Sequence, residues 1–197
     1  MNIDVHAHII GPAFYDAVKK IPGVTFEPNR YGIGIRKNGE TVINLSENWF
    51  SAKHHVGEMD KRRIDLSLLS LTTPNLYVFP KEMQAAAARI ANDEAVDRAR
   101  MFPDRVRVLA SLPLDDIPAA VAEIDRVAGI KEVCGISVGS NVNGVQISDP
   151  RFEPVWAEIN KHKMAVVQHP NFPPFAADCR NTTCRSCSAS SSRRRSA

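Results

Sequence analysis

Five short apolar runs divide the chain at intervals that suit alternating strands and helices. Each run is apolar at successive positions rather than at every second one, which is typical of parallel strands covered on both faces. The predicted strands are Ile3–His8, Leu66–Thr72, Val106–Leu112, Val133–Val138 and Ala165–His169. Helix-forming segments lie between the later runs. The pattern therefore predicts an α/β protein built from repeated strand–helix–strand units around a parallel sheet.

Three helices are predicted between the last four of these strands. Pro80–Met101 is rich in Ala, Glu, Arg and Met, which are good helix formers. Ile117–Ala128 places its apolar residues on one face at helical spacing, with Asp115 or Asp116 as the N-cap. A third helix is predicted over Pro154–His162.

The segment between the first and second strands is too long for a single crossover helix. Within it, Ile33–Lys37 and Thr41–Leu45 flank Asn38-Gly39, a dipeptide that favours a type I′ hairpin. Ser51–Arg63 then has the pattern of the crossover helix. We expect this small hairpin insertion to lie over the C-terminal end of the sheet, where α/β folds bind ligands.

The composition is that of a globular domain, with 44% hydrophobic and 24% charged residues. No run approaches the roughly 18 apolar residues that a membrane helix needs, and no secretory signal follows the first Met. We therefore expect a cytoplasmic protein. The net charge of +3 is unevenly spread, because the last 20 residues carry five Arg and one Asp and the first 177 residues carry −1.

The C-terminal segment differs in kind from the rest. Cys179–Ala197 contains no aliphatic residue larger than Ala and is dominated by Ser, Arg, Cys and Thr. Such a segment buries too little apolar area to offset its ordering entropy, so we predict that it is disordered. We divide the chain into a domain over residues 1–177 and a basic tail over residues 178–197. The tail is either natural or the product of a shifted reading frame, and its abrupt composition favours the second interpretation.

Histidines close two of the predicted strands. His6 and His8 are two apart in a strand, so both imidazoles point to one face, and Asp4 is expected on the same face. His169 ends the last predicted strand, and parallel strands bring their C-terminal ends to one rim. Three neutral imidazoles suit Zn²⁺ and leave positions open for water or substrate. The alternative is that these are polar strand-end residues with no shared ligand.

Other candidates are weaker. His54 and His55 lie in a predicted helix, where adjacent residues diverge by about 100°, so a surface or supporting role is favoured over a shared ion. His162 is expected to cap its helix or to face solvent. Cys184 and Cys187 have zinc-knuckle spacing but lack a second pair. The run Arg193–Arg195 is weak evidence for nucleic-acid binding, which we regard as the less favoured function.

Five motifs occur in a characteristic order. They are Asp4-Val5-His6-Ala7-His8, Glu58-Met59-Asp60, Val138-Gly139-Ser140-Asn141-Val142-Asn143-Gly144, Asp149-Pro150-Arg151-Phe152-Glu153-Pro154-Val155-Trp156 and Gln168-His169-Pro170. In this order the chain resembles the amidohydrolase-related branch that includes aminocarboxymuconate-semialdehyde decarboxylase. The similarity runs from about residue 1 to about residue 176. The set is specific for the branch, although no motif in it is specific for one substrate.

The resemblance implies a (β/α)8 barrel, also called a TIM barrel, and a divalent metal, usually Zn²⁺, held by His6, His8 and His169. It also implies a later Asp that completes the metal site and a later acid/base His, both expected beyond this chain. No catalytic or substrate-binding residue is therefore assigned within it. The implied activity is a carboxy-lyase reaction, the non-oxidative decarboxylation of an unsaturated or aromatic carboxylic acid. The family often forms homodimers.

One position departs from the pattern of the decarboxylase. Ser46 stands where we expect an Arg that contacts the substrate carboxylate, and Arg30 or Arg36 could substitute, although surface solvation is the simpler role for each. Two alternative functions stay open. One is a hydrolase of the same superfamily acting on a lactone or amide with the same ligands. The other is a non-catalytic fragment with a basic binding tail.

The number of strands suggests an incomplete barrel. A barrel of this class has eight strands and about 250 residues, whereas five strands are predicted here. We therefore expect a barrel truncated after about five strands. Such a product would carry open apolar edges and lack its proton-transfer group, so we expect poor solubility and no activity when it is expressed alone.

Overall fold

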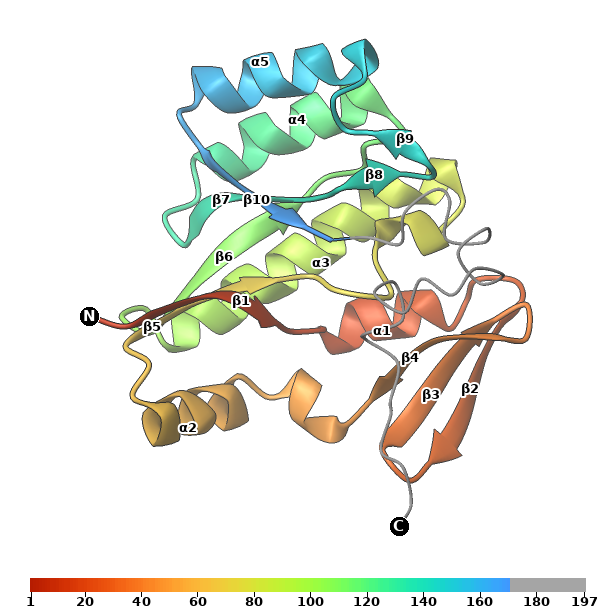
Figure 1. Ribbon diagram of the computed structural model, residues 1–197, viewed down its shortest axis with the longest axis vertical. Helices are drawn as coiled ribbons and strands as arrows, with labels where there is room; N and C mark the ends of the chain where they lie inside the picture. The colour runs from red at the N-terminus through yellow and green to blue at the C-terminus, as the bar shows by residue number, and fades with distance from the viewer. Residues whose placement is uncertain (171–197) are drawn as a thin grey trace, which may run out of the picture.

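The computed structural model describes residues 1–170, in which five parallel strands form the central sheet (Figure 1). The strand order is β1-β5-β6-β7-β10, and every neighbouring pair is parallel. The strands are β1 (Ile3–His8), β5 (Leu66–Ser70), β6 (Val106–Ser111), β7 (Val133–Gly139) and β10 (Ala165–His169). All five predicted strands are confirmed, with ends that agree to within two residues.

Five α-helices connect these strands. They are α1 (Pro12–Val18), α2 (Ala52–Arg62), α3 (Lys81–Met101), α4 (Ile117–Ala128) and α5 (Glu153–Lys161). The Ser51 side chain caps α2 by accepting from the backbone N–H of His54, and Asp116 rather than Asp115 caps α4 by accepting from Ala119. Helix α1 was not predicted, because its sequence opens with Gly11 and Pro12, which also favour a loop.

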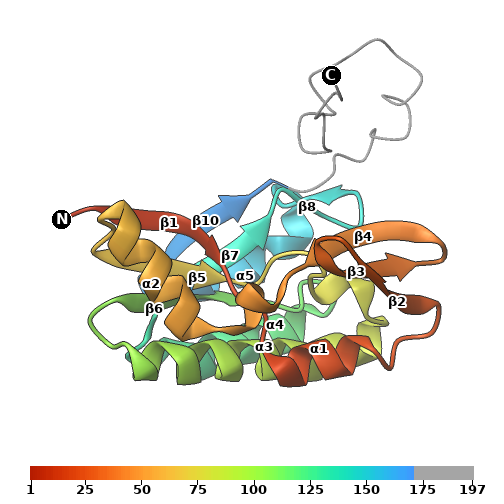
Figure 2. The same ribbon diagram turned by 90° about the horizontal axis from the view of Figure 1, so that it is seen from below.

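Helices α2, α3, α4 and α5 pack against one side of the sheet, and α3 runs beneath the strands in the view of Figure 2. Apolar side chains of α2 and α3, such as Met59 and Ala99, pack against β1, β5 and β6. Those of α4 and α5, such as Ile124 and Val155, pack against β6 and β7. Strand residues such as Leu69 are fully buried against these helices.

A three-stranded antiparallel sheet follows α1, with β2 (Val24–Asn29), β3 (Gly32–Lys37) and β4 (Glu40–Leu45) in that order. Asn38 and Gly39 have φ values of 51° and 84°, the left-handed conformations that a type I′ turn requires. The predicted hairpin is confirmed. Strand β2 was missed because Pro28 argues against a strand, but β2 is an edge strand and tolerates it.

Short elements complete the loops that leave the strands. They are the 3-10 helices η1 (Glu47–Phe50), η2 (Leu76–Val78) and η3 (Pro150–Phe152) and the two-residue strands β8 (Asn141–Val142) and β9 (Val145–Gln146), which pair in an antiparallel hairpin. None of them was predicted. The antiparallel sheet, η1 and the β8–β9 hairpin lie toward the C-terminal ends of the parallel strands (Figure 1).

The parallel sheet is strongly curled. Strands β1 and β10 lie at opposite edges of it, so a flat sheet with strand spacings of about 4.8 Å would separate them by about 19 Å. Yet the Nε2 atoms of His6 on β1 and His169 on β10 are 3.1 Å apart. The two outer strands therefore bend toward each other around the open side of the sheet, which makes a half-barrel.

The outer strands expose apolar side chains. Ile3 and Val5 on β1 are 45% and 52% exposed, and Val166 on β10 is 42% exposed. Within residues 1–170, both strands pair on one side only. Exposed apolar edge strands promote aggregation. They support the expectation of poor solubility, which stays a prediction.

Two sequence predictions concern residues outside the described part. The end of the proposed domain and the whole basic tail, residues 178–197, lie beyond residue 170. The choice between a natural tail and a shifted reading frame therefore stays open. Across residues 1–170, no helix combines the length and apolar content needed to span a membrane.

Candidate metal centre

Three imidazoles meet across the open side of the half-barrel. His6 and His8 come from the end of β1, and His169 comes from the end of β10. The Nε2 atom of His169 lies 3.1 Å from that of His6 and 3.2 Å from that of His8. The rings of His6 and His8 are edge-to-face, with centroids 4.8 Å apart. The structure thus brings together the three histidines that the sequence singled out.

The environment of these rings favours their neutral form. Burial, followed by the neighbouring His169 and His6, lowers the pKa of His8 from 6.5 to about 4. Burial also lowers the pKa of His169. A metal ion binds the neutral imidazole, so these conditions suit a ligand role.

The hydrogen bond of His169 fixes which of its nitrogens is available. Its Nδ1 atom lies 3.0 Å from the carbonyl oxygen of Pro170, which can only accept, so Nδ1 carries the proton. The Nε2 lone pair therefore faces His6 and His8. With Zn–N bonds of about 2.05 Å, tetrahedral ligands lie about 3.3 Å apart, close to the separations found here. The donor set fits a divalent cation.

The expectation that Asp4 shares this face is wrong. The pairing of β1 with β5 shifts register between Asp4 and Ala7, so the alternation of side chains is interrupted there. Asp4 pairs in register with Ser67 and accepts a hydrogen bond from the backbone N–H of His6 at 3.0 Å. Within residues 1–170, the donor atoms that converge at this rim are those of the three histidines.

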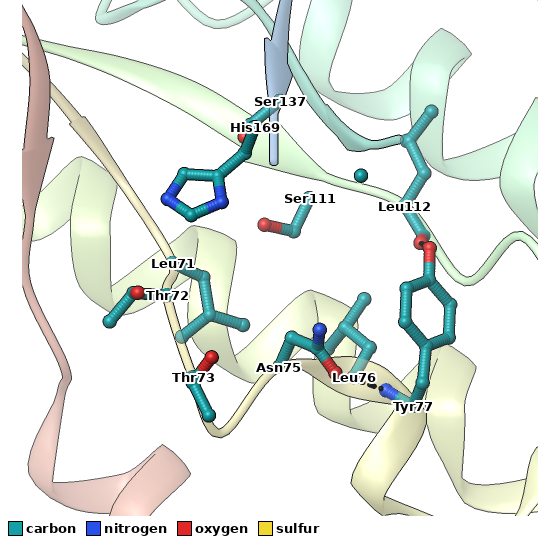
Figure 3. Close-up of a pocket in the computed structure, with 11 residues that line it drawn as sticks. Leu71, Thr72, Thr73, Asn75, Leu76, Tyr77, Ser111, Leu112, Ser137 and His169 are labelled. Carbon is teal, nitrogen blue, oxygen red and sulfur yellow. Dashed lines mark hydrogen bonds between the residues drawn. The ribbon is translucent and has the colours of Figure 1, made fainter. Parts of the chain in front are cut away.

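A pocket opens beside His169 at the C-terminal ends of β5, β6, β7 and β10 (Figure 3). His169 and Tyr77 lie on opposite sides of it, with Ser111 between them. Burial raises the pKa of the Tyr77 hydroxyl, which donates to the Leu112 carbonyl at 3.4 Å. The lining consists of Leu71, Thr72, Thr73, Asn75, Leu76, Tyr77, Ser111, Leu112, Ser137, Gly139 and His169. Among residues 1–170, no Lys, Arg, Asp or Glu lines the pocket, so the walls that they form are neutral, hydroxyl-rich and partly apolar.

A row of serines near the ends of adjacent strands was missed by the sequence analysis. Ser70, Ser111 and Ser137 lie on β5, β6 and β7, and Ser111 and Ser137 are register partners. The signal was present, because each of these strands carries Ser near its C-terminus. Its meaning depends on which side chains face the inside of the curl, which the apolar pattern does not reveal.

The remaining sequence candidates lie elsewhere. His54 is exposed, whereas His55 is half-buried and its Nε2 contacts the Ser67 hydroxyl at 3.0 Å. Arg36 pairs with Glu27 at 2.8 Å, and the Arg30 guanidinium lies over a neighbouring Tyr ring. These contacts agree with supporting and surface roles.

A second donor group lies on the outer surface between α4 and α5. The Nε2 atom of His162 is 2.7 Å from Asp125 and 3.1 Å from Glu158. Lys161 is also ion-paired to both carboxylates, at 3.4 Å and 2.5 Å. His162 caps α5, as predicted, but its ion pairs were not foreseen. Both carboxylates of this group are therefore already paired with Lys161 and His162.

The curled parallel sheet and its histidine rim define the chain as a barrel-type protein with a metal-capable site. The family model described as amidohydrolase matches residues 3–186, and the chain belongs to this family. The family resemblance drawn from the sequence motifs is thereby confirmed.

Two curated relatives are decarboxylases. The chain is 33% identical over 127 residues to gamma-resorcylate decarboxylase of Rhodococcus jostii (strain RHA1), covering 58% of this chain and 38% of the relative. It is 26% identical over 186 residues to 2-amino-3-carboxymuconate-6-semialdehyde decarboxylase of Dictyostelium discoideum, covering 86% of this chain and 49% of the relative. The chain thus spans half or less of the length of these relatives.

A solved structure confirms the fold. The chain aligns with 5-carboxyvanillate decarboxylase of Novosphingobium aromaticivorans DSM 12444 at a TM-score of 0.73 and 17% identity, covering 96% of this chain and 57% of that one. That enzyme was crystallised with manganese and 4-hydroxy-3-methoxy-5-nitrobenzoic acid. The half-barrel described here is therefore the fold of about half of a TIM-barrel decarboxylase of the amidohydrolase superfamily.

Proposed function

We propose that this chain supplies the first half of a metal-dependent carboxy-lyase that decarboxylates an aromatic or unsaturated carboxylic acid. His6, His8 and His169 would hold the divalent cation. The observation that carries the proposal is the convergence of three histidines from opposite edges of one sheet. The Nε2 atom of His169 on β10 lies 3.1 Å from that of His6 and 3.2 Å from that of His8, both on β1. Names of the relatives support the reaction class, since those compared are decarboxylases of carboxylic acids.

The pocket supports a small organic acid as substrate. When bound, the cation would act as a Lewis acid that polarises substrate oxygen atoms. His169 belongs to the pocket wall, so a molecule in the pocket would lie beside the cation. Leu71, Leu76 and Leu112 offer apolar contacts for a ring or a conjugated chain, and the Ser and Thr hydroxyls offer hydrogen bonds to its substituents.

The reaction also requires a proton. The bond between the substrate carbon and its carboxylate breaks, CO₂ leaves, and a proton is delivered to that carbon. The three histidines are engaged as ligands in this proposal, so they are poor proton donors. The proton donor would be the acid/base His that the family resemblance implies outside the 197 residues. The resemblance implies that the Asp that completes the metal site lies outside them as well.

We propose Zn²⁺ as the bound cation, because neutral imidazoles suit it well. Manganese is the alternative, as in the Novosphingobium enzyme. Titrating the metal-free chain with each ion in competition with a chromophoric chelator tests this choice. We expect one Zn²⁺ per chain with tighter binding than Mn²⁺. Tighter Mn²⁺ binding would overturn the assignment.

The activity is best tested on an enzyme that carries a complete barrel. Sequencing the gene downstream of the codon for Ala177 shows whether another frame encodes the later strands, and that product can be expressed and loaded with metal. We expect CO₂ release from hydroxylated benzoates and no ring opening of lactones. Lactone or amide hydrolysis without CO₂ release would instead support the hydrolase alternative. Homodimerisation and a cytoplasmic location stay predictions from the sequence.

A further inference from the structure

The His8 ring is held in place by contacts on the side away from the other histidines and on one of its faces. Its Nδ1 atom, on the side of the ring away from the other histidines, lies 3.1 Å from the Ser70 hydroxyl and 3.4 Å from the Ser70 carbonyl oxygen. Ser70 ends β5 and is only 5% exposed. The indole of Trp49 lies parallel to the His8 ring, with an interplanar angle of 7° and centroids 6.4 Å apart.

The contacts of Ser70 indicate which atoms donate and which accept in the hydrogen bonds to His8. The Ser70 hydroxyl donates to the carbonyl oxygen of Ala7 at 3.4 Å, which uses its only proton. Its lone pairs are therefore left to accept from His8. The Ser70 carbonyl can only accept as well. Both contacts place the proton of neutral His8 on Nδ1, so Nε2 carries the lone pair that points toward His169.

Backbone contacts hold this arrangement in place. The N–H of Ile9 donates to the Ser70 carbonyl at 3.3 Å, and the N–H of Ile10 donates to the Trp49 carbonyl at 3.2 Å. Ser70 and Trp49, which flank the His8 ring, are thus hydrogen-bonded to the two residues that follow His8. The position of the ring is set by β5 and by the end of the insertion, not by β1 alone.

We propose that Ser70 is the positioning residue that fixes the His8 tautomer and aims its Nε2 atom at the cation. This inference rests on the proposed metal centre. Groups that orient the free nitrogen of a metal-bound His typically contribute about 10- to 100-fold to metal affinity. Ser70 does not touch the cation, so it acts only through His8.

The test combines two measurements on the 197-residue chain. Nitrogen-15 NMR of the metal-free wild type identifies the protonated nitrogen of His8, and we expect Nδ1. Zn²⁺ affinity is then measured by competition with a chromophoric chelator for Ser70→Ala, Ser70→Thr and Ser67→Ala. Ser67 is a matched control, because it is a buried serine on the same strand that contacts His55, which lies outside the candidate site.

We expect Ser70→Ala to weaken Zn²⁺ binding by about 10- to 100-fold, and Ser70→Thr and Ser67→Ala to change it by less than about threefold. The inference is overturned if Ser70→Ala binds Zn²⁺ like the wild type, or if Ser67→Ala weakens binding as much. A proton on Nε2 of His8 in the wild type also overturns it, even if Ser70→Ala does not fold. A wild type that binds no Zn²⁺ but carries the proton on Nδ1 overturns the metal centre and upholds the tautomer assignment.

Discussion

Two groups of metal-capable side chains lie in different surroundings on this molecule. At the rim, three half-buried or exposed histidines bring their ring nitrogens together, and no carboxylate of residues 1–170 joins them. On the outer surface, Asp125, Glu158 and His162 also bring their donor atoms within 4.8 Å of one another. There, however, Lys161 and His162 already pair with both carboxylates.

The comparison shows that proximity of donor atoms does not define a metal site. At the outer group, a cation would have to displace Lys161 and compete with existing ion pairs. At the rim, the Nε2 lone pairs of His8 and His169, whose Nδ1 atoms carry the proton, face each other at 3.2 Å and repel until a cation or a proton lies between them. Burial disfavours the proton there, because it lowers the pKa of His8 and of His169. We therefore expect the rim, rather than the outer group, to bind a metal ion.

The largest expected effect that separates the two groups is loss of metal binding. Replacing His169 by Ala should weaken Zn²⁺ binding by more than about 100-fold, because even losing a group that orients a ligand reaches that range. His162→Ala, the matched change at the outer group, should leave the affinity unchanged. Isothermal titration of both variants measures this. Equal losses in the two variants would remove the distinction between the sites.

A bound metal should also stabilise the fold. The cation would join β1 to β10, which are not paired with each other in the described sheet. Zn²⁺ at 100 times its dissociation constant should raise the free energy of unfolding by about 2.7 kcal/mol. Urea unfolding with Zn²⁺ or with a chelator measures the difference. The gain should vanish in His6→Asn and persist in Asp125→Asn, and a gain that survives in His6→Asn would contradict the rim site.

Trp49 should have an intermediate effect. Its stacking on His8 is of a kind worth about 0.5–1.5 kcal/mol, so Trp49→Leu should weaken Zn²⁺ binding by about 2- to 12-fold. Trp49→Phe should restore most of the loss, because it keeps an aromatic face. Trp156→Phe on α5 serves as the control for a tryptophan away from the rim. Unchanged affinity in Trp49→Leu would show that the stacking does not support the ligand.

The smallest effect is expected at the outer group. The hydrogen bond from His162 is the main cause that holds the pKa of Asp125 below its ordinary value of 3.8. A carboxyl with a lowered folded-state pKa stabilises the fold above its unfolded pKa, and this contribution is lost as the pH falls through the folded-state value. Asp125→Asn should therefore lower the midpoint temperature of thermal unfolding slightly at neutral pH, since exposed ion pairs contribute little to stability. The two proteins should converge in acid. A difference that grows as the pH falls would show that the ion pair is not its source.

Much of the fold could be predicted because the apolar pattern reflects the burial of the central strands β5, β6 and β7 against the helices. β1 and β10 were located to the residue, and so were their histidines. The pattern failed where local geometry departs from regularity. The register shift in β1 interrupts the alternation of side chains, so Asp4 does not share a face with His8. The edge position of β2 accommodates Pro28.

The sequence by itself determined which side chains end the strands and which residue types could bind a cation, because strand periodicity and ligand chemistry are local properties. Only the tertiary structure decided that the two edges of the sheet meet. That meeting depends on the curl of the whole sheet and on the helices packed against it, to which residues far apart in the chain contribute. It also decided that Ser70 faces His8, since side chains from neighbouring strands come together only after the strands have paired.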